Sequence, residues 1–365
     1  MSDRHLLLAS PVIVAWLVLA QAAAAVDLAG RAAVGGGGLE HPLGVAEEPS
    51  SPYVTGDVDL RVVLGDTTQW RLTYAGSGTR FDPDVPLDYL RQAFGVEWLR
   101  LRPRDRWTVS AGLQGEVRRQ ADVYRIYDHD GAYGYVAFKT YPDPRVMLRG
   151  WVGIRLRTYR DLPEESCVEP HAVLEVKRFG DDRTTLGAAL RLGGKWFHDP
   201  VAPKVWGTAG TPVTSQVTVS LDAARGVADR VGVRAGVDLS LGLRGFPYYV
   251  AEDLYDSPLL DRYAHTGPAA VAAVKWLTPL AAWLELGVGV AGNDYGEILF
   301  ADGAGGGSTR RDDVVDIFAS CERPFLTRGT GMVVRGAVSW RDQSSSLAAY
   351  TWTGLQFTAG AEWRF

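Results

Sequence analysis

The chain contains little cysteine, with only Cys167 and Cys321 among its 365 residues. Two cysteines are too few for a disulfide framework, and no CxxC or Cys/His spacing predicts a metal or another cofactor. The chain also lacks an excess of basic residues. Its formal net charge is -5, which argues against a nucleic-acid partner. The motifs G-x-S-x-G and H-E-x-x-H are absent as well. We therefore predict no enzyme, no metal and no cofactor.

Long apolar runs are almost absent outside the first residues. There, Arg4 precedes an apolar run from Leu6 to Leu19, and small residues follow up to Ala25. This order is typical of a secretory signal peptide, so we predict a signal peptide over residues 1–25 and export from the cytoplasm. An N-terminal membrane anchor is the alternative, but the run is shorter than the ~20 residues that a helical span needs.

Residues 269–292 form the only other long apolar segment. Lys275, Glu285 and the Thr278-Pro279 break interrupt it, and each is costly in a helix surrounded by lipid. Its second half alternates apolar and small or charged side chains. Two strands joined by a tight turn are therefore the better interpretation.

The mature chain, residues 26–365, has period-two alternation almost throughout. The stretch "RVGVRAGVDLSLGLRG", for example, places valines and leucines on one face and Arg234, Asp238 and Arg244 on the other. We predict strands at residues 27–35, 53–64, 68–76, 89–102, 106–119, 132–141, 145–159, 169–179, 183–197, 213–224, 229–245, 267–277, 280–293, 312–325, 329–342 and 348–365.

The links between these strands alternate in length. Links after even-numbered strands are short, whereas most links after odd-numbered strands are long: 36–52, 77–88, 120–131, 160–168, 198–212, 246–266 and 294–311. A soluble sandwich gives no reason for this alternation, but a transmembrane antiparallel β-barrel does, because its periplasmic turns are short and its extracellular loops long. We predict such an all-β barrel of about 16 strands. Within the long links, Gly35–Gly38 and Gly303–Gly307 are interpreted as flexible loop tips.

The end of the chain supports the same fold. In "FTAGAEWRF" the side chains of Phe357, Ala359, Ala361, Trp363 and Phe365 occupy alternate positions up to the last residue. Together with the signal peptide and the all-strand pattern, this resembles the bacterial outer-membrane β-barrel family, without identifying a subfamily. The resemblance implies a porin-like protein of a Gram-negative outer membrane. It also implies that Phe357, Trp363 and Phe365 form a membrane-insertion signal for the barrel-insertion machinery.

The seventh to eleventh predicted strands carry most of the inward-facing charge. Their inward positions include three acidic residues, Glu175, Asp222 and Asp238. They also include eight basic residues: Arg149, Arg155, Arg157, Lys177, Arg191, Lys195, Arg234 and Arg244. Two interpretations stay open. The basic wall favours anionic solutes in a narrow pore, or the charges form ion pairs that only satisfy one another. The aromatic and acidic link 246–266 is interpreted either as a constriction or as an exposed extracellular loop.

These patterns predict transport of hydrophilic solutes, anionic ones among them, through a porin-like channel surrounded by outer-membrane lipids. The alternative is the exit conduit of a polysaccharide export system; such a conduit would need a separate periplasmic secretion partner, since no helical repeat is present. A plugged structural or adhesive barrel is a third hypothesis. The pattern does not fix an oligomeric state.

Overall fold

The computed structural model describes residues 26–40, 50–82, 88–102, 106–121, 125–126, 128–163, 166–198, 213–244, 265–301, 307–327 and 330–365. The predicted signal peptide and most of the link 246–266 lie outside these residues. Within them, no helix is long and apolar enough to cross a membrane.

Sixteen strands follow one another along the chain. They are β1 Val26–Leu39, β2 Ser51–Leu64, β3 Thr68–Phe81, β4 Tyr89–Arg102, β5 Trp107–Gln120, β6 His129–Asp143, β7 Val146–Tyr159, β8 Cys167–Phe179, β9 Thr184–Phe197, β10 Val213–Ala228, β11 Val231–Arg244, β12 Gly267–Leu277, β13 Trp283–Ala301, β14 Gly307–Thr327, β15 Thr330–Ser345 and β16 Trp352–Arg364. A single 3-10 turn, η4 Ala348–Tyr350, lies between β15 and β16.

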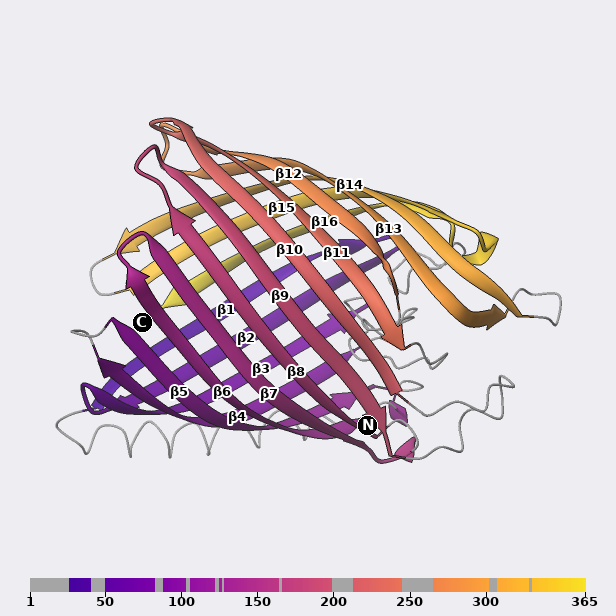
Figure 1. Ribbon diagram of the computed structural model, residues 1–365, viewed down its shortest axis with the longest axis horizontal. Helices are drawn as coiled ribbons and strands as arrows, with labels where there is room; N and C mark the ends of the chain where they lie inside the picture. The colour runs from indigo at the N-terminus through magenta and orange to yellow at the C-terminus, as the bar shows by residue number, and fades with distance from the viewer. Residues whose placement is uncertain are drawn as a thin grey trace.

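The sheet closes on itself. Each strand pairs with its neighbours in sequence, and β1 pairs antiparallel with β16 (Figure 1). Across this seam the Gly30 N–H donates to the Phe365 carbonyl at 2.8 Å, and the Phe365 N–H donates to the Gly30 carbonyl at 3.0 Å. In lipid an open edge would leave backbone groups unpaired, so closure is what allows such a sheet to span a membrane. The predicted closed antiparallel barrel of 16 strands is confirmed.

The two faces of the barrel follow from the alternation in the sequence. Large apolar side chains lie uncovered on the outer face; Leu113, for example, is 68% exposed and Leu286 is 63% exposed. Charged side chains such as Arg149 and Glu175, which pair across β7 and β8, lie on the inner face. A continuous apolar exterior of this extent would be unfavourable in water, and it suits hydrocarbon. The outer face is therefore the lipid-facing surface, and the inner face lines the lumen.

Link lengths distinguish the two ends. The links at 65–67, 144–145, 180–183 and 229–230 are short and lie at the end where the strand β16 finishes. In outer-membrane barrels short turns face the periplasm. We call this the periplasmic end and the opposite one the extracellular end. The segment 269–292 crosses as β12 and β13 with a turn between them, as the break at Thr278-Pro279 predicts.

The glycine run Gly35–Gly38 is not a loop tip, and that prediction is wrong. The run continues β1 and pairs with both β2 and β16. A Cβ at Gly38 would lie 2.6 Å from the Phe357 ring, and one at Gly36 would lie 2.8 Å from the Tyr53 carbonyl oxygen. Only glycine allows the three backbones to approach this closely, so the run is a requirement of closure.

The predicted loop 294–311 is also largely strand. The strands β13 and β14 continue as a hairpin that resumes pairing at Leu299 and Thr309 after an irregularity. In Figure 1 the arrow of β13 reaches past the end of β11. Outside the lipid a hairpin needs no apolar face, so its sequence lacks the alternation on which the prediction depended.

Candidate functional site

The lumen wall of β6 to β9 contains most of the predicted pore-lining residues. Partners in register share a face, so the pairs Arg149–Glu175, Arg149–Lys139 and Arg157–Cys167 all face the lumen. The same registers place Arg155, Lys177, Arg191, Lys195, Arg234 and Asp238 on this face. Arg244 ends β11, and its side chain lies outside the described part of the structure.

Glu175 lies at the centre of a triad that is open to the lumen. Its carboxylate is 2.8 Å from Lys177 Nζ and 3.5 Å from Arg149 Nε. The Arg149 side chain is 48% exposed, which shows that solvent reaches this part of the wall. Two cations contact one carboxylate here, so the triad carries a net charge of about +1.

A second cluster lies nearer the extracellular end. Glu169 is 3.6 Å from Lys195 Nζ, 3.7 Å from Arg155 and 3.8 Å from Arg157. Lys195 and Glu169 are fully buried, so this cluster is covered rather than open. Among the described residues, three cations thus surround one carboxylate. Glu169, the first residue of the predicted strand 169–179, was not among the predicted lumen residues.

Neighbouring strands continue the charged wall with matched pairs. Arg191 is 3.8 Å from Asp238, and Arg234 donates to Glu285 at 2.6 Å. On the far side of the barrel, near the seam, three arginines contact three carboxylates: Arg31, Arg335 and Arg364 with Asp59, Glu322 and Glu362. These pairs are close to neutral. The positive excess is therefore concentrated on β7 to β9.

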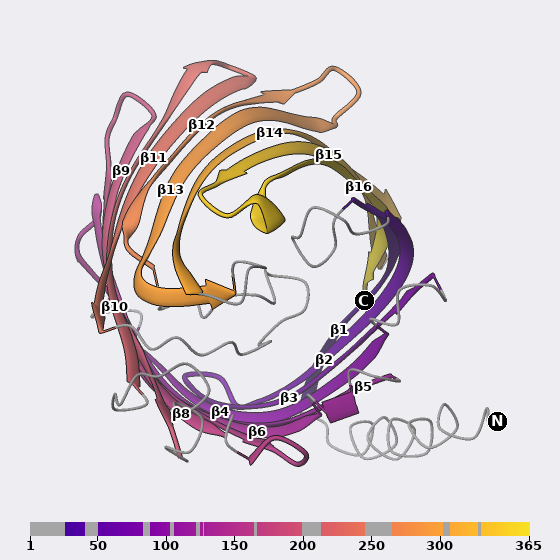
Figure 2. The same cartoon turned by 90° about the vertical axis from the view of Figure 1, so that its right-hand side faces the viewer.

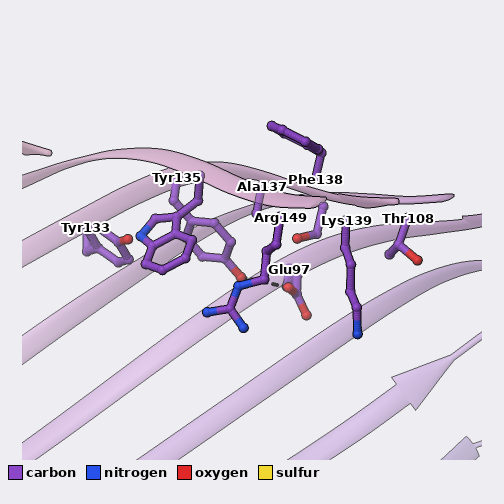
Figure 3. Close-up of a pocket in the computed structure, with 10 residues that line it drawn as sticks. Glu97, Thr108, Tyr133, Tyr135, Ala137, Phe138, Lys139 and Arg149 are labelled. Carbon is purple, nitrogen blue, oxygen red and sulfur yellow. Dashed lines mark hydrogen bonds between the residues drawn. The ribbon is translucent and has the colours of Figure 1, made fainter. Parts of the chain in front are cut away.

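An aromatic recess adjoins the Glu175 triad. It has a volume of about 340 Å³ and is lined by Glu97, Thr108, Ser110, Tyr133, Tyr135, Ala137, Phe138, Lys139, Arg149 and Trp151. Figure 3 shows Arg149 and Lys139 pointing to the same side as the Tyr135 ring, whereas Phe138 points the opposite way.

Contacts among the recess residues hold the rings in place. The rings of Tyr133 and Tyr135 stack at 5.5 Å, and the Tyr135 hydroxyl donates to Glu97 at 2.7 Å. The Arg149 guanidinium lies 4.7 Å from the centroid of the Trp151 ring. The period-two pattern did not predict this group of aromatic residues, since such a pattern gives the face of a residue but not its neighbours on other strands. The recess offers flat rings beside two cations.

A described segment of chain folds into the lumen at the extracellular end. Figure 2 shows η4 inside the ring of strands. The Arg310 guanidinium lies 3.6 Å from the centroid of the Tyr350 ring, and it donates to both carboxylate oxygens of Asp312. Both charged side chains are buried. The link 246–266, interpreted as either a constriction or an exposed loop, lies outside the described residues up to 264. Within the described part of the chain, η4 extends into the lumen (Figure 2).

The C-terminal residues lie where their alternation predicts. Phe357, Trp363 and Phe365 are on the outer face and are 54%, 40% and 52% exposed. The Phe365 ring packs over Gly30 of β1. Among the described residues, no group of His, Cys, Asp and Glu is arranged to hold a metal ion.

The closed sheet, the apolar exterior and the charged lumen define the class of protein. The chain is a 16-stranded β-barrel of the bacterial outer membrane, with the fold of a porin.

Comparison with solved structures agrees with this class. The chain is similar to CdiB from Acinetobacter baumannii at 6% identity and a TM-score of 0.53, and the match covers 92% of this chain and 60% of CdiB. It therefore spans less than two thirds of CdiB. OccAB1 from Acinetobacter baumannii matches at 9% identity and a TM-score of 0.54, over 92% of this chain and 96% of OccAB1. OpdK from Pseudomonas aeruginosa, solved with vanillate, matches at 12% identity and a TM-score of 0.51. The match covers 93% of this chain and 98% of OpdK.

At these identities the likeness shows the fold alone. No family model matches the sequence, and no curated protein matches it.

Proposed function

We propose that the barrel is an outer-membrane channel for hydrophilic solutes and that its lumen favours anionic ones. The observation that carries this proposal is on β7 to β9, where, within the described part of the chain, five cations lie within 4 Å of Glu169 or Glu175. A wall of one sign raises the local concentration of the opposite ion inside a narrow channel. No covalent chemistry is required.

The ion pairs on this wall reduce its field without cancelling it. Glu175 can neutralise one of its two partners, and the half-exposed Arg149 then remains available to a passing anion. Fixed cations in a water-filled lumen bind an anion weakly, as conduction requires, because the solute must also leave. Both earlier interpretations of the charges are therefore parts of one arrangement: ion pairs that leave a positive excess.

The aromatic recess suggests the kind of anion. Flat rings such as Trp151 and Tyr133 provide stacking surface, while Lys139 and Arg149 provide positive charge at the rim of the same hollow. Small acids that contain a ring match both features. OpdK, which shares the fold, was solved with one such acid, vanillate. We therefore propose cyclic carboxylic acids as solutes.

A further proposal concerns a partner. The outward Phe357, Trp363 and Phe365 support recognition of β16 by the barrel-insertion machinery. Nothing in the described part of the chain favours the polysaccharide conduit over the channel.

A liposome-swelling experiment tests the channel. The purified barrel is reconstituted, and the swelling rates in glucose and in gluconate of the same osmolarity are compared, since the two solutes are of similar size and differ in charge. We expect swelling with both and a higher rate with gluconate. Equal rates would remove the anion preference, and no swelling with either solute would exclude an open channel.

A further inference from the structure

The balance of positive and negative charge on the outer face differs between the two ends of the barrel. Outward positions at the extracellular end carry both signs: Arg80, Arg119, Asp130, Asp294, Arg311, Asp313 and Asp342. At the periplasmic end, the outward positions of the described strands carry one acidic residue, Asp143, beside five arginines: Arg100, Arg102, Arg178, Arg225 and Arg323. This end of the lipid-facing surface is therefore complementary to an anion.

An apolar groove on the outer face begins beside two of these arginines. Its volume is about 660 Å³, and Trp70, Trp98 and Leu113 are among its lining residues. The groove is deepest at Ala111 and Gly134, because these residues have small side chains or none. Arg100 follows Trp98 by two residues on the same face of β4, so it lies about 7 Å further along the strand towards the periplasm.

The register shows how the groove runs. Trp70, Trp98, Ala111, Val136 and Val152 form one row of paired residues across β3 to β7. Trp70 lies two residues from the periplasmic end of β3, whereas Val152 lies six residues from that end of β7. The groove therefore rises from the periplasmic interface towards the middle of the membrane.

The dimensions match one lipid chain. The row crosses four strand spacings of about 4.8 Å, or about 19 Å along an oblique path. One leaflet contributes about 15 Å of hydrocarbon thickness. A second hollow of about 320 Å³ shares Val136 and Val152 and continues the groove past Ala172.

We propose that this groove is a binding site for an anionic phospholipid, with one acyl chain along the row from Trp70 to Val152 and the phosphate on Arg100 and Arg102. Guanidinium groups bind phosphate oxygens in pairs, and long basic side chains reach from an apolar surface to the headgroup level. Arg102 lies 5.2 Å from the centroid of the Trp107 ring, which keeps its guanidinium at the interface.

Native mass spectrometry of the full mature barrel tests the site. The protein in mild detergent is titrated with dipalmitoyl phosphatidylglycerol or with dipalmitoyl phosphatidylethanolamine, and the apparent dissociation constants are compared. We expect phosphatidylglycerol to bind more tightly by about fivefold for each arginine that it engages. The double variant R100Q/R102Q should lose this preference. The matched variant R80Q/R311Q, at the extracellular end, should keep it.

A second pair of variants tests the groove itself. A111L fills the groove at Ala111. It should weaken the binding of both lipids about equally and leave the preference for phosphatidylglycerol unchanged. A272L adds the same side chain to the outer face of β12, away from the groove, and should change the affinity for neither lipid. Migration of unheated and heated samples on a gel verifies that each variant is folded. Equal binding of the two lipids to the native barrel would overturn the proposal, as would an equal loss in R80Q/R311Q or no weakening in A111L.

Discussion

The triad of Arg149, Glu175 and Lys177 allows its charge to be changed one unit at a time. The native triad carries about +1, E175Q about +2, R149Q about zero, and R149Q/K177Q about -1, because each substitution removes one charge and keeps a polar side chain of similar size. Arg149 is 48% exposed and Lys177 is 34% exposed, so a passing ion meets these charges in water rather than in a dry interior.

The magnitude follows from the distance of closest approach. Two unit charges 4 Å apart in water interact by about 1 kcal/mol, which changes the local concentration of a univalent anion by about fivefold. Salt weakens this effect, because the screening length is about 10 Å at 0.1 M. We expect the anion selectivity to fall in the order E175Q, native protein, R149Q, R149Q/K177Q. The differences in selectivity between these proteins should be larger at low salt.

Reversal potentials in planar bilayers under a tenfold gradient of potassium chloride measure this order. The decisive comparison is between E175Q and R149Q. If the charges served only to satisfy one another, both variants would disturb the same network and shift the reversal potential in the same direction. Shifts of equal sign would therefore refute the reasoning, whereas opposite signs support a lumen whose net charge selects the solute.

Three further predictions concern the barrel and its mouth. G38V should reduce the folded fraction by overpacking that costs about 1 to 3 kcal/mol, measured by heat-modified migration on gels, while G115V, with open space around its Cβ, should not. R310Q breaks a buried pair with Asp312 and should raise single-channel conductance as η4 leaves the lumen; unchanged conductance would contradict the constriction. Deletion of Phe365 removes two backbone hydrogen bonds of the seam and should lower the amount assembled in cells, and normal assembly would argue against an insertion signal.

Much of the fold could be predicted because lipid-facing and lumen-facing side chains alternate along each strand of a membrane barrel, which gives the sequence a period of two. The alternation through Val231–Arg244 predicted both the strand and its lipid face, and the interrupted segment 269–292 predicted a hairpin. The errors occur where lipid imposes no pattern. Gly35–Gly38 has no side chains to alternate, and the hairpin extension beyond Asp294 lies outside the lipid.

The candidate site was predictable only in part. Alternation placed Arg149 and Arg155 on the inner face, but the contacts that decide their net charge join separate strands. The three cations around Glu169, and the recess between Tyr133 and Trp151, depend on strand register and tilt. The inward position of η4 depends on the fit of Arg310 against Tyr350, which no local pattern encodes.

The most direct test of the central claim is the reversal potential of the native barrel in a planar bilayer with potassium chloride at about 0.01 M on one side and about 0.1 M on the other, where the screening length is about 10 to 30 Å. The positive excess on β7 to β9 predicts discrete conductance steps and a reversal potential of the sign set by chloride. Cation selectivity, or no conductance from folded protein, would contradict it.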